Sequence, residues 1–330
     1  MILSNSGDPK MKNDPEFEGH VGSMLQRQKL DWDLARKNYE GLNQVLEKNF
    51  DFGHFTIKVQ FNPSRIVSSS AKVDAKSIRE RKCFLCPAHL PVEQESIAFG
   101  EEYLILMNPF PIFRRHLTIP LKGHIPQAII DRLSDMLELA RALPNYTLFY
   151  NGPQCGASAP DHMHFQAGVK GIMPLDEEFG RIIEKEGTIL IARKDFRLSA
   201  LKGILRNGIA MESGSIAQLI IFFKRLYDIL KEVPGKEPLM NVLSSFENGI
   251  WRLIVFPRDR HRPKQFFQEG ENGLLLSPAS VDFGGVLITP REEDFYKMSK
   301  DLIVDIFQQV SMNTEKFDQL VENLLEMESK

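Results

Sequence analysis

A five-residue stretch, His-Met-His-Phe-Gln, alternates polar and apolar side chains from residue 162 onward. Successive side chains of a β-strand point to opposite faces, so His162, His164 and Gln166 are predicted to share one face. Met163 and Phe165 then share the other, apolar face. Three polar groups on one face of a strand are costly to bury without partners, which favours contact with solvent, a metal ion or a ligand. We therefore expect a functional site on this strand.

The rest of the chain combines many strand-like runs with fewer amphipathic helices. A hairpin is predicted within residues 52–73, with its turn at Asn62-Pro63-Ser64. Further strands are predicted at 103–107, 116–120, 146–152, 162–168, 239–246, 250–257, 273–277 and 284–290. Helices are predicted at 23–49, 125–143, 177–187, 215–233 and within 292–328. This pattern predicts an α+β fold.

Composition narrows the class of protein. With 330 residues, the chain is long enough for two domains, and 42% hydrophobic with 26% charged residues is ordinary for a globular protein. A net charge of -3 excludes a general polyanion binder, so we expect neither nucleic acid nor a membrane as partner. No apolar run reaches membrane-spanning length and the start is not a signal peptide, so we expect a cytoplasmic protein. Only three cysteines are present, which argues against a disulfide framework.

Two strand-rich regions share a faint repeat. In each region a His lies four residues after a Pro that ends an apolar strand, Pro120 to His124 and Pro257 to His261. A weaker sequence similarity relates two loops that begin with Asn-Gly, at residues 151 and 272. We therefore predict a duplicated domain whose second copy is degenerate, because only the first copy keeps the chemical residues. The predicted boundaries are a tail and helix at 1–50, a catalytic half at 51–175 and a degenerate half at 176–330 with a C-terminal helix.

Cys83 and Cys86 form a Cys-x-x-Cys pair that has three interpretations: a redox dithiol, half of a zinc site, or two buried thiols. The segment after Pro87 is loop-like and does not supply the helix that a thioredoxin-like redox unit needs. Zinc would require two more ligands, for which thiolates and neutral imidazoles suit its borderline softness. The candidate histidines are His89, His116, His124 and His162.

Two other segments are candidates for binding phosphate. The loop at 150–160 is rich in Gly and small residues, which permits a close approach of backbone N–H groups to an anion. The run Phe-Pro-Arg-Asp-Arg-His-Arg-Pro-Lys-Gln at 256–265 is densely basic. It is either a solvated loop or a segment whose side chains contact the outer phosphates of a substrate. Other candidate cations near the site are Arg65, Arg79, Arg81, Arg114 and Arg115.

Taken together, these segments resemble the histidine-triad superfamily. The closer resemblance is to its transferase branch, which contains galactose-1-phosphate uridylyltransferase, diadenosine tetraphosphate phosphorylase and GDP-hexose phosphorylase. That branch carries His-x-His-x-Gln, and the resemblance covers nearly all of the chain after residue 50. It implies duplicated histidine-triad-like domains, each an antiparallel sheet with flanking helices, the second copy being degenerate.

The resemblance also implies residue roles. His164 would be the nucleophile and Gln166 would hydrogen-bond the phosphoryl oxygens. Cys83, Cys86, His124 and His162 match the zinc set of several members, and the zinc would be structural because four protein ligands leave no open position. The nucleotide- and substrate-binding positions implied are Asn62, Arg65, Asn108, Asn151 and Ser158. Ser158 lies six residues before His164, where the family spacing is five, and His116 matches a position with either a supporting or a catalytic role.

The function implied is that of a nucleotidyltransferase or phosphorylase. Its donor would be a nucleoside diphosphate sugar or a dinucleoside polyphosphate, and a covalent nucleotidyl-histidine would pass to a phosphate or sugar-phosphate acceptor. The type, whether GDP-hexose phosphorylase, ATP adenylyltransferase or hexose-1-phosphate uridylyltransferase, is left open, as is assembly into a homodimer. Two alternatives remain: a hydrolase of the same superfamily, and a non-catalytic nucleotide-binding module.

Overall fold

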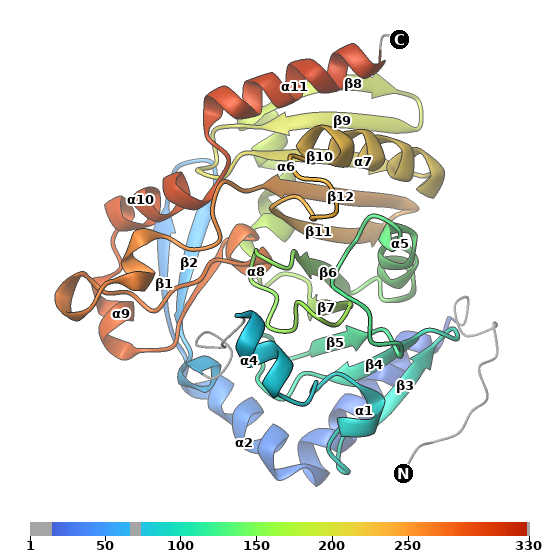
Figure 1. The fold of residues 1–330 in the computed structure, drawn as a ribbon, viewed down its shortest axis with the longest axis vertical. Coiled ribbons are helices and arrows are strands. Elements are labelled where there is room, and N and C mark those ends of the chain that lie inside the picture. Colours follow the sequence, from blue (N-terminus) through green and yellow to red (C-terminus); the bar gives the residue numbers. More distant parts are fainter. Residues whose placement is uncertain (1–14, 67–73, 329–330) are drawn as a thin grey trace.

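The computed structural model describes residues 15–66 and 74–328, and one ten-stranded sheet dominates it (Figure 1). Every neighbouring pair in this sheet is antiparallel, and the strand order is β3-β4-β5-β7-β6-β11-β12-β10-β9-β8. The first five strands of this order are β3 (Ser96–Phe99), β4 (Tyr103–Met107), β5 (His116–Pro120), β7 (His164–Val169) and β6 (Tyr146–Asn151). The other five are β11 (Met240–Glu247), β12 (Ile250–Pro257), β10 (Gly208–Ser213), β9 (Phe196–Leu201) and β8 (Gly187–Arg193).

The two halves of this sheet meet where β6 pairs with β11, with Asn151 opposite Asn241. In chain order each half contains three antiparallel strands, then one helix, then a pair of strands. The helix is α5 (Leu133–Ala142) in the first half and α7 (Ile216–Leu230) in the second. In the sheet the two halves run outward from the junction in the same order, so that each ends on the strand that comes first in its own half.

Helices cover both faces of the large sheet. On one face a continuous apolar core joins the strands to α5, α7, α1 (Phe17–Asp31), α2 (Asp33–Gly41) and α11 (Thr314–Glu328). On the opposite face a second core contains α6 (Pro174–Glu186), α8 (Ser280–Phe283), α9 (Glu292–Lys297) and α10 (Lys300–Val310). The α+β class predicted from the sequence is therefore confirmed, with antiparallel pairing throughout the main sheet.

A small sheet on this second face ties the end of the chain to its beginning. It consists of β1 (Leu46–Asp51), β2 (Thr56–Phe61) and β13 (Val286–Thr289), and β13 pairs in parallel with β2. Ile57 and Val59 of β2 and Leu287 of β13 are buried in the same core as α10. Folding of the small sheet thus requires segments that lie more than two hundred residues apart in the sequence.

Several predictions of secondary structure were wrong in detail. The single helix predicted at 23–49 is two helices, α1 and α2, which are separated at Trp32 and end at Gly41, because Leu46–Asp51 pairs as β1 with β2. The helix predicted at 125–143 begins only at Leu133. The hairpin turn lies around Gly53, whose φ of +87° suits glycine, and not at Asn62-Pro63-Ser64, where Pro63–Arg65 form a short 3-10 helix. The second arm predicted for that hairpin falls mostly on 67–73, outside the described residues. The predicted tail before residue 15 also lies outside them.

The strand predicted at 273–277 does not form, because its backbone groups bond elsewhere. The N–H groups of Leu274 and Leu276 donate to the carbonyl oxygens of Gln265 and Leu274. The sequence similarity around Pro120 and Pro257 does not correspond to equivalent strands. Pro120 ends β5, the third strand from its edge of the sheet, whereas Pro257 ends β12, the fourth strand from the other edge. None of the described helices is both long and apolar enough to cross a lipid bilayer.

Candidate active site between two cavities

Strand β7 carries the polar pair His164 and Gln166 through the middle of the first half of the sheet. It lies between β5 and β6, with His164 opposite Pro120 and Gln166 opposite Thr118. Met163 and Phe165 are buried in the core on the other face, as the alternation predicts. His162 departs from the prediction, because it lies before the strand in a bend and its ring turns to the cysteine pair instead.

The ring of His164 is held in one tautomer. Its Nδ1 atom lies 2.8 Å from the carbonyl oxygen of His162, and since a carbonyl only accepts, Nδ1 carries the proton and donates. The Nε2 atom is therefore left with a free lone pair. Burial lowers the pKa of His164 from 6.5 to about 4, so the ring is neutral at pH 7. A neutral, oriented imidazole can act as a nucleophile without a separate base.

Gln127 braces the backbone of the same residue. The N–H of His164 donates to Gln127 Oε1 at 2.8 Å, and Gln127 Nε2 donates to the carbonyl oxygens of His164 and Asn151, both at 3.0 Å. This buried amide comes from the segment before α5 and links β7 to the end of β6. These bonds fix the position of the His164 backbone, and therefore the point from which its ring extends.

The side chain of Gln166 is oriented by His116. The backbone N–H of Ile112 donates to His116 Nδ1 at 3.1 Å, so the ring proton lies on Nε2, which faces the side-chain oxygen of Gln166 at 3.0 Å. His116 therefore donates and Gln166 accepts through Oε1, which leaves the Gln166 amide N–H groups free to donate elsewhere. Burial lowers the pKa of His116 to about 3, which keeps this arrangement neutral.

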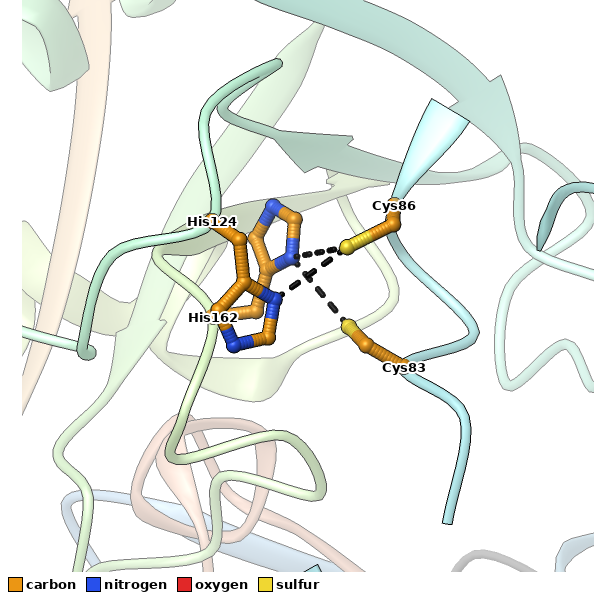
Figure 2. Close-up of side chains that lie close together, drawn as sticks. All are labelled: Cys83, Cys86, His124 and His162. Atoms are coloured by element: carbon orange, nitrogen blue, oxygen red, sulfur yellow. Dashed lines mark hydrogen bonds between the residues drawn. The ribbon is translucent and has the colours of Figure 1, made fainter. Parts of the chain in front are cut away.

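Four of the predicted metal ligands converge beside the strand (Figure 2). The ligand atoms of Cys83, Cys86, His124 and His162 all lie within 4.8 Å of one another. Cys83 Sγ lies 3.2 Å from His162 Nδ1, and Cys86 Sγ lies 3.1 Å from His124 Nδ1. The other two candidate histidines are not part of the cluster, because His116 bonds Gln166 and His89 Nδ1 bonds the carbonyl oxygen of Cys83.

The surroundings of the cluster fit a bound metal ion. His162 Nε2 donates to the Leu121 carbonyl oxygen at 2.7 Å, which leaves Nδ1 unprotonated toward the two sulfurs. His124 Nε2 lies 3.6 Å from a carboxylate oxygen of Asp161, the kind of outer partner that orients a ligating imidazole. Two thiols and two imidazoles form a donor set that suits zinc. These residues could therefore hold a metal ion.

A large, mainly apolar cavity opens beside His164. Its volume is about 560 Å³. Its walls come from the α1–α2 junction at Trp32 and Leu34, from Phe84 and Leu85 after the first cysteine, and from the segment 106–110. Its polar lining residues include His164, Gln166 and Ser158. A mainly apolar cavity with a few polar groups is typical of a site for a small organic ligand.

A second, smaller cavity of about 80 Å³ lies beyond Gln166 and Ser158, which line both cavities. Residues from both halves of the chain line it. Arg65, Asn151 and the loop 156–158 come from the first half, and His261, Arg262 and Asp282 from the second. Gly156 has a φ of +98°, and a Cβ atom there would lie 2.5 Å from that of Ala279. Only glycine therefore permits this contact between the halves.

Asn151 is held by residues of the second half. Ser280 N–H donates to Asn151 Oδ1 at 2.8 Å, and Asn241 Nδ2 donates to the same oxygen at 3.1 Å. Asn241 Nδ2 also lies 2.8 Å from the carbonyl oxygen of Cys155, in the loop that leads to Ser158. The buried guanidinium of Arg258 donates to Asn241 Oδ1. Because Asn151 Oδ1 is occupied, its Nδ2 group is left to donate elsewhere.

The remaining predicted residues have different environments. Asn108 lines the large cavity and bonds the Thr118 hydroxyl at 2.9 Å, whereas Asn62 bonds the Pro111 carbonyl oxygen at 3.0 Å. In the described part of the chain Asn62 supports the 110–112 segment from outside both cavities. Among the candidate arginines, Arg65 lines the small cavity and Arg81 the large one, and the exposed ones are Arg79, Arg114 and Arg115.

Sequence reasoning missed the residues that hold the site from a distance: Gln127, Asn241, Arg258 and Ser280. They lie on segments far from the His-x-His-x-Gln stretch, and their spacing from it is set only by the fold. The basic run at 256–265 was the one available signal, since it contains Arg258 and Arg262. The sequence could not say which of its cations are buried.

Comparison with known proteins agrees with this architecture. Residues 24–169 match the family described as a domain of unknown function (DUF4922), and residues 188–330 match the family described as a GDPGP1-like C-terminal domain. The crystal structure of yeast Ap4A phosphorylase Apa2 in complex with Ap4A has a TM-score of 0.57 at 16% identity, covering 89% of this chain and 97% of that one. Its complex with AMP has a TM-score of 0.56 at 17% identity, covering 88% and 95%. No curated protein sequence matches the chain significantly.

Proposed function

We propose that the chain is a nucleotidyltransferase of the histidine-triad-like branch, acting through His164. Support comes from the match of residues 188–330 to a GDPGP1-like C-terminal domain and from the likeness of the fold to that of yeast Ap4A phosphorylase. The observation that carries the proposal is the single tautomer of His164. Its unprotonated Nε2 atom can attack a phosphorus atom bound in the large cavity, and Gln166, on the same strand, lines both cavities.

The reaction proceeds in two displacements. In the first, His164 Nε2 forms a bond to the α-phosphorus of a nucleoside diphosphate sugar or a dinucleoside polyphosphate. The bond from that phosphorus to the bridging oxygen breaks, and the leaving phosphate takes the electron pair. In the second, an oxygen of the acceptor phosphate bonds to phosphorus and the electron pair returns to Nε2. The Nδ1 proton stays on the ring throughout, donated to the carbonyl oxygen of His162.

Gln166 stabilises the charge that develops on the phosphoryl oxygens. Because His116 occupies its side-chain oxygen, its amide N–H groups are the part presented to the substrate. An amide cannot protonate a leaving group, and a phosphate leaving group needs no proton. Gln166 therefore favours transfer between phosphates over the expulsion of a poor leaving group.

The two cavities divide the substrate between them. The large one accepts the nucleoside, with Asn108 at the ribose, and its apolar walls of Trp32, Phe84 and Leu85 fit a nucleobase. The phosphate groups lie toward Asn151, Arg65 and Ser158, which line the small cavity. Asn62 acts indirectly, by holding the 110–112 segment that lines the small cavity at Ile112.

The cysteine and histidine cluster, Cys83, Cys86, His124 and His162, would hold a structural zinc ion. Four protein ligands leave no position for substrate, so zinc would crosslink the segment around Cys83 and Cys86 to the loops before β7. Such a crosslink would hold the His162 carbonyl oxygen in place, and this oxygen orients the His164 ring. The chain's own residues perform the chemistry, and zinc supplies only the crosslink.

The chain is also proposed to be a duplicated histidine-triad-like fold with a degenerate second copy. Support comes from the order of elements, because three strands, a helix and two strands occur in each half and occupy equivalent positions in the sheet. The proposed division is a tail and helix at 1–50, a catalytic half at 51–175 and a second half at 176–330. The strand equivalent to β7 is β12, and at its positions the second copy has no His-x-His-x-Gln.

Turnover assays test the reaction class. The purified chain is incubated with GDP-glucose, GDP-galactose, UDP-glucose or diadenosine tetraphosphate, each with and without inorganic phosphate. We expect at least one donor to yield a nucleoside diphosphate that requires phosphate, and H164N to yield none. Release of the nucleoside monophosphate independent of phosphate would instead identify a hydrolase. Binding of a nucleotide without any product and without nucleotidyl label on the protein would identify a binding module.

A further inference from the structure

One segment of the first half, residues 125–129, lies beside the start of β7 and holds its backbone. The N–H of Met163 donates to the Ile125 carbonyl oxygen at 2.8 Å. Two residues further on, Gln127 accepts from the N–H of His164 at 2.8 Å and donates to the His164 carbonyl oxygen at 3.0 Å. The position of the His164 backbone therefore depends on where the 125–129 segment lies.

The 125–129 segment is itself held at both ends. At its beginning, His124 belongs to the cysteine and histidine cluster, with its Nδ1 atom 3.1 Å from Cys86 Sγ (Figure 2). At its end, the N–H of Ile129 donates to the carboxylate of Glu237, 3.1 Å from Oε2 and 3.4 Å from Oε1. Glu237 lies in the connection between α7 and β11, in the second half. The half that lacks the His-x-His-x-Gln stretch thus contributes to the support of this stretch.

Glu237 has a second buried partner in the large sheet. The hydroxyl of Tyr150, on β6, donates to Glu237 Oε1 at 2.5 Å. Burial raises the pKa of Glu237 to about 7, because a carboxylate away from water is poorly solvated, and the two donors stabilise its ionised form. One carboxylate therefore joins β6 to the end of the 125–129 segment.

Glu237 does not act on a substrate directly. Neither Glu237 nor its two partners, Tyr150 and Ile129, line the large or the small cavity. Any effect of this carboxylate on the chemistry must therefore pass through the backbone, from Ile129 along the 125–129 segment to His164. The alternative is that Glu237 only stabilises the junction of the two halves, and a test has to separate these roles.

We infer that Glu237 is a positioning residue for His164 and acts on it through the 125–129 segment. With the Ile129 N–H held, the backbone around His164 stays in place, and the ring keeps the 2.8 Å contact of its Nδ1 atom with the His162 carbonyl oxygen. The direction of Nε2 is then fixed, and a nucleophile displaced by about 1 Å can lose about 10²-fold in rate. The effect of Glu237 on the reaction rests on the proposed function, whereas its effect on the segment does not.

Amide hydrogen exchange, followed by mass spectrometry at pH 8, tests the positioning without any turnover. The proteins are the wild type, E237L and the matched control E232L, since Glu232 is exposed in the same connection between α7 and β11. In E237L we expect exchange to rise about tenfold or more in peptides covering 125–130 and 162–166, because a local opening becomes easier. Peptides from β12 should keep the wild-type rate, and E232L should match the wild type throughout. A uniform rise in all peptides of E237L, or no rise in these two segments, would overturn the inference.

E237Q is the milder variant and allows a rescue. Its amide keeps one acceptor oxygen, but its –NH₂ group opposes one of the two donors, Tyr150 O–H or Ile129 N–H. We expect the same local rise in exchange as in E237L, at smaller size. Adding Y150F removes one of the opposed donors, so E237Q/Y150F should regain part of the lost protection at 125–130. Protection that falls further in the double variant would contradict a role through Ile129.

A kinetic readout separates this inference from the proposed function. In single turnovers at saturating donor, the rate constant for label formation on His164 should fall about tenfold or more in E237L, while the Kd of the nucleotide changes less than about twofold. If no protein forms a label but exchange rises locally in E237L, the hold of Glu237 on the His164 backbone stands and the covalent function fails. If E237L forms the label at the wild-type rate, the function stands and the positioning role fails.

Discussion

At the scale of single residues, the site depends on two rings whose protons are placed by backbone groups. The His162 carbonyl oxygen fixes the proton of His164, and the Ile112 N–H fixes that of His116. That His164 and Gln166 share one face of a strand could be predicted from the sequence, because alternation alone puts them there. The tautomers could not, because they depend on backbone atoms that only the folded chain brings within reach.

Replacing Gln166 by leucine tests the role of its amide. The change keeps the approximate volume and removes the donors to the phosphoryl oxygens, so kcat should fall about 10²-fold. The large cavity keeps its apolar walls, and nucleotide affinity should change far less than kcat. The metal content, measured in the same preparation, should equal that of the wild type. An unchanged kcat would contradict the role given to Gln166.

The buried imidazole of His116 predicts a dependence of stability on pH. The pKa of His116 is about 3 in the folded chain and about 6.5 in the unfolded chain. Below pH 6.5 the unfolded chain therefore binds a proton at this ring that the folded chain does not bind. This contribution is complete above pH 6.5 and is lost as the pH falls toward 3. Denaturant unfolding from pH 7 to 4.5 should show H116Q losing stability less steeply than the wild type, by up to about 1.4 kcal/mol per pH unit.

The control for this comparison is H54Q, which removes an exposed imidazole and should follow the wild-type slope. Buried acids such as Glu237, whose pKa burial raises to about 7, act with the opposite sign. They are common to all three proteins and cancel in the difference. Parallel slopes for the wild type and H116Q would show that His116 is not held neutral in the folded chain.

At the scale of elements, the central strands were predictable and the small sheet was not. Strands such as β6 and β7 are continuous apolar or alternating runs with a buried face, and their patterns specify them. Strand β1 is mostly exposed, so its sequence carries little pattern, and the preceding helical periodicity was extended through it. The run at 273–277 is apolar but its backbone groups bond to Gln265 and Leu274, which periodicity cannot reveal.

The cysteine and histidine cluster belongs to the scale of elements, because a metal ion held there would crosslink the segment after α4 (Ala75–Glu80) to the loops around β5 and β7. Replacing Cys83 by serine should reduce bound zinc from about one equivalent to below about 0.1 and lower Tm by several degrees. Metal analysis and thermal unfolding measure the two effects. C155S is the matched control, since Cys155 is a buried thiol outside the cluster and its loss should leave zinc content unchanged. Equal zinc in C83S and the wild type would remove the metal site.

At the scale of the whole molecule, the two halves share one continuous sheet, and we expect them to unfold together. The large sheet is continuous across β6 and β11, and β13 of the second half completes the small sheet begun by β2. The predicted domain boundary near residue 175 therefore does not separate two independent cores. Neighbouring segments are visible in a sequence, whereas the pairing of β2 with β13 joins segments that no local pattern connects.

The two tryptophans offer a test of this cooperativity. Trp32 lies in the first half, and Trp251 lies on β12, where its Nε1 donates to the Leu137 carbonyl oxygen at 2.8 Å. In W251F only Trp32 reports, and in W32F only Trp251 reports. Each fluorescence midpoint in denaturant should coincide with the circular dichroism midpoint of the same variant. Separate transitions for fluorescence and circular dichroism would show that the halves unfold independently.

The central claim is that His164 becomes covalently nucleotidylated. The most direct measurement is a single turnover with an α-³²P-labelled donor in the absence of phosphate, followed by mass spectrometry of the peptide that contains residue 164. The account predicts about one label per chain, stable to alkali and labile to acid, located on His164 and discharged by added phosphate. It predicts no label in H164N. A donor consumed at full rate without protein label, or a label that persists in H164N, would contradict it.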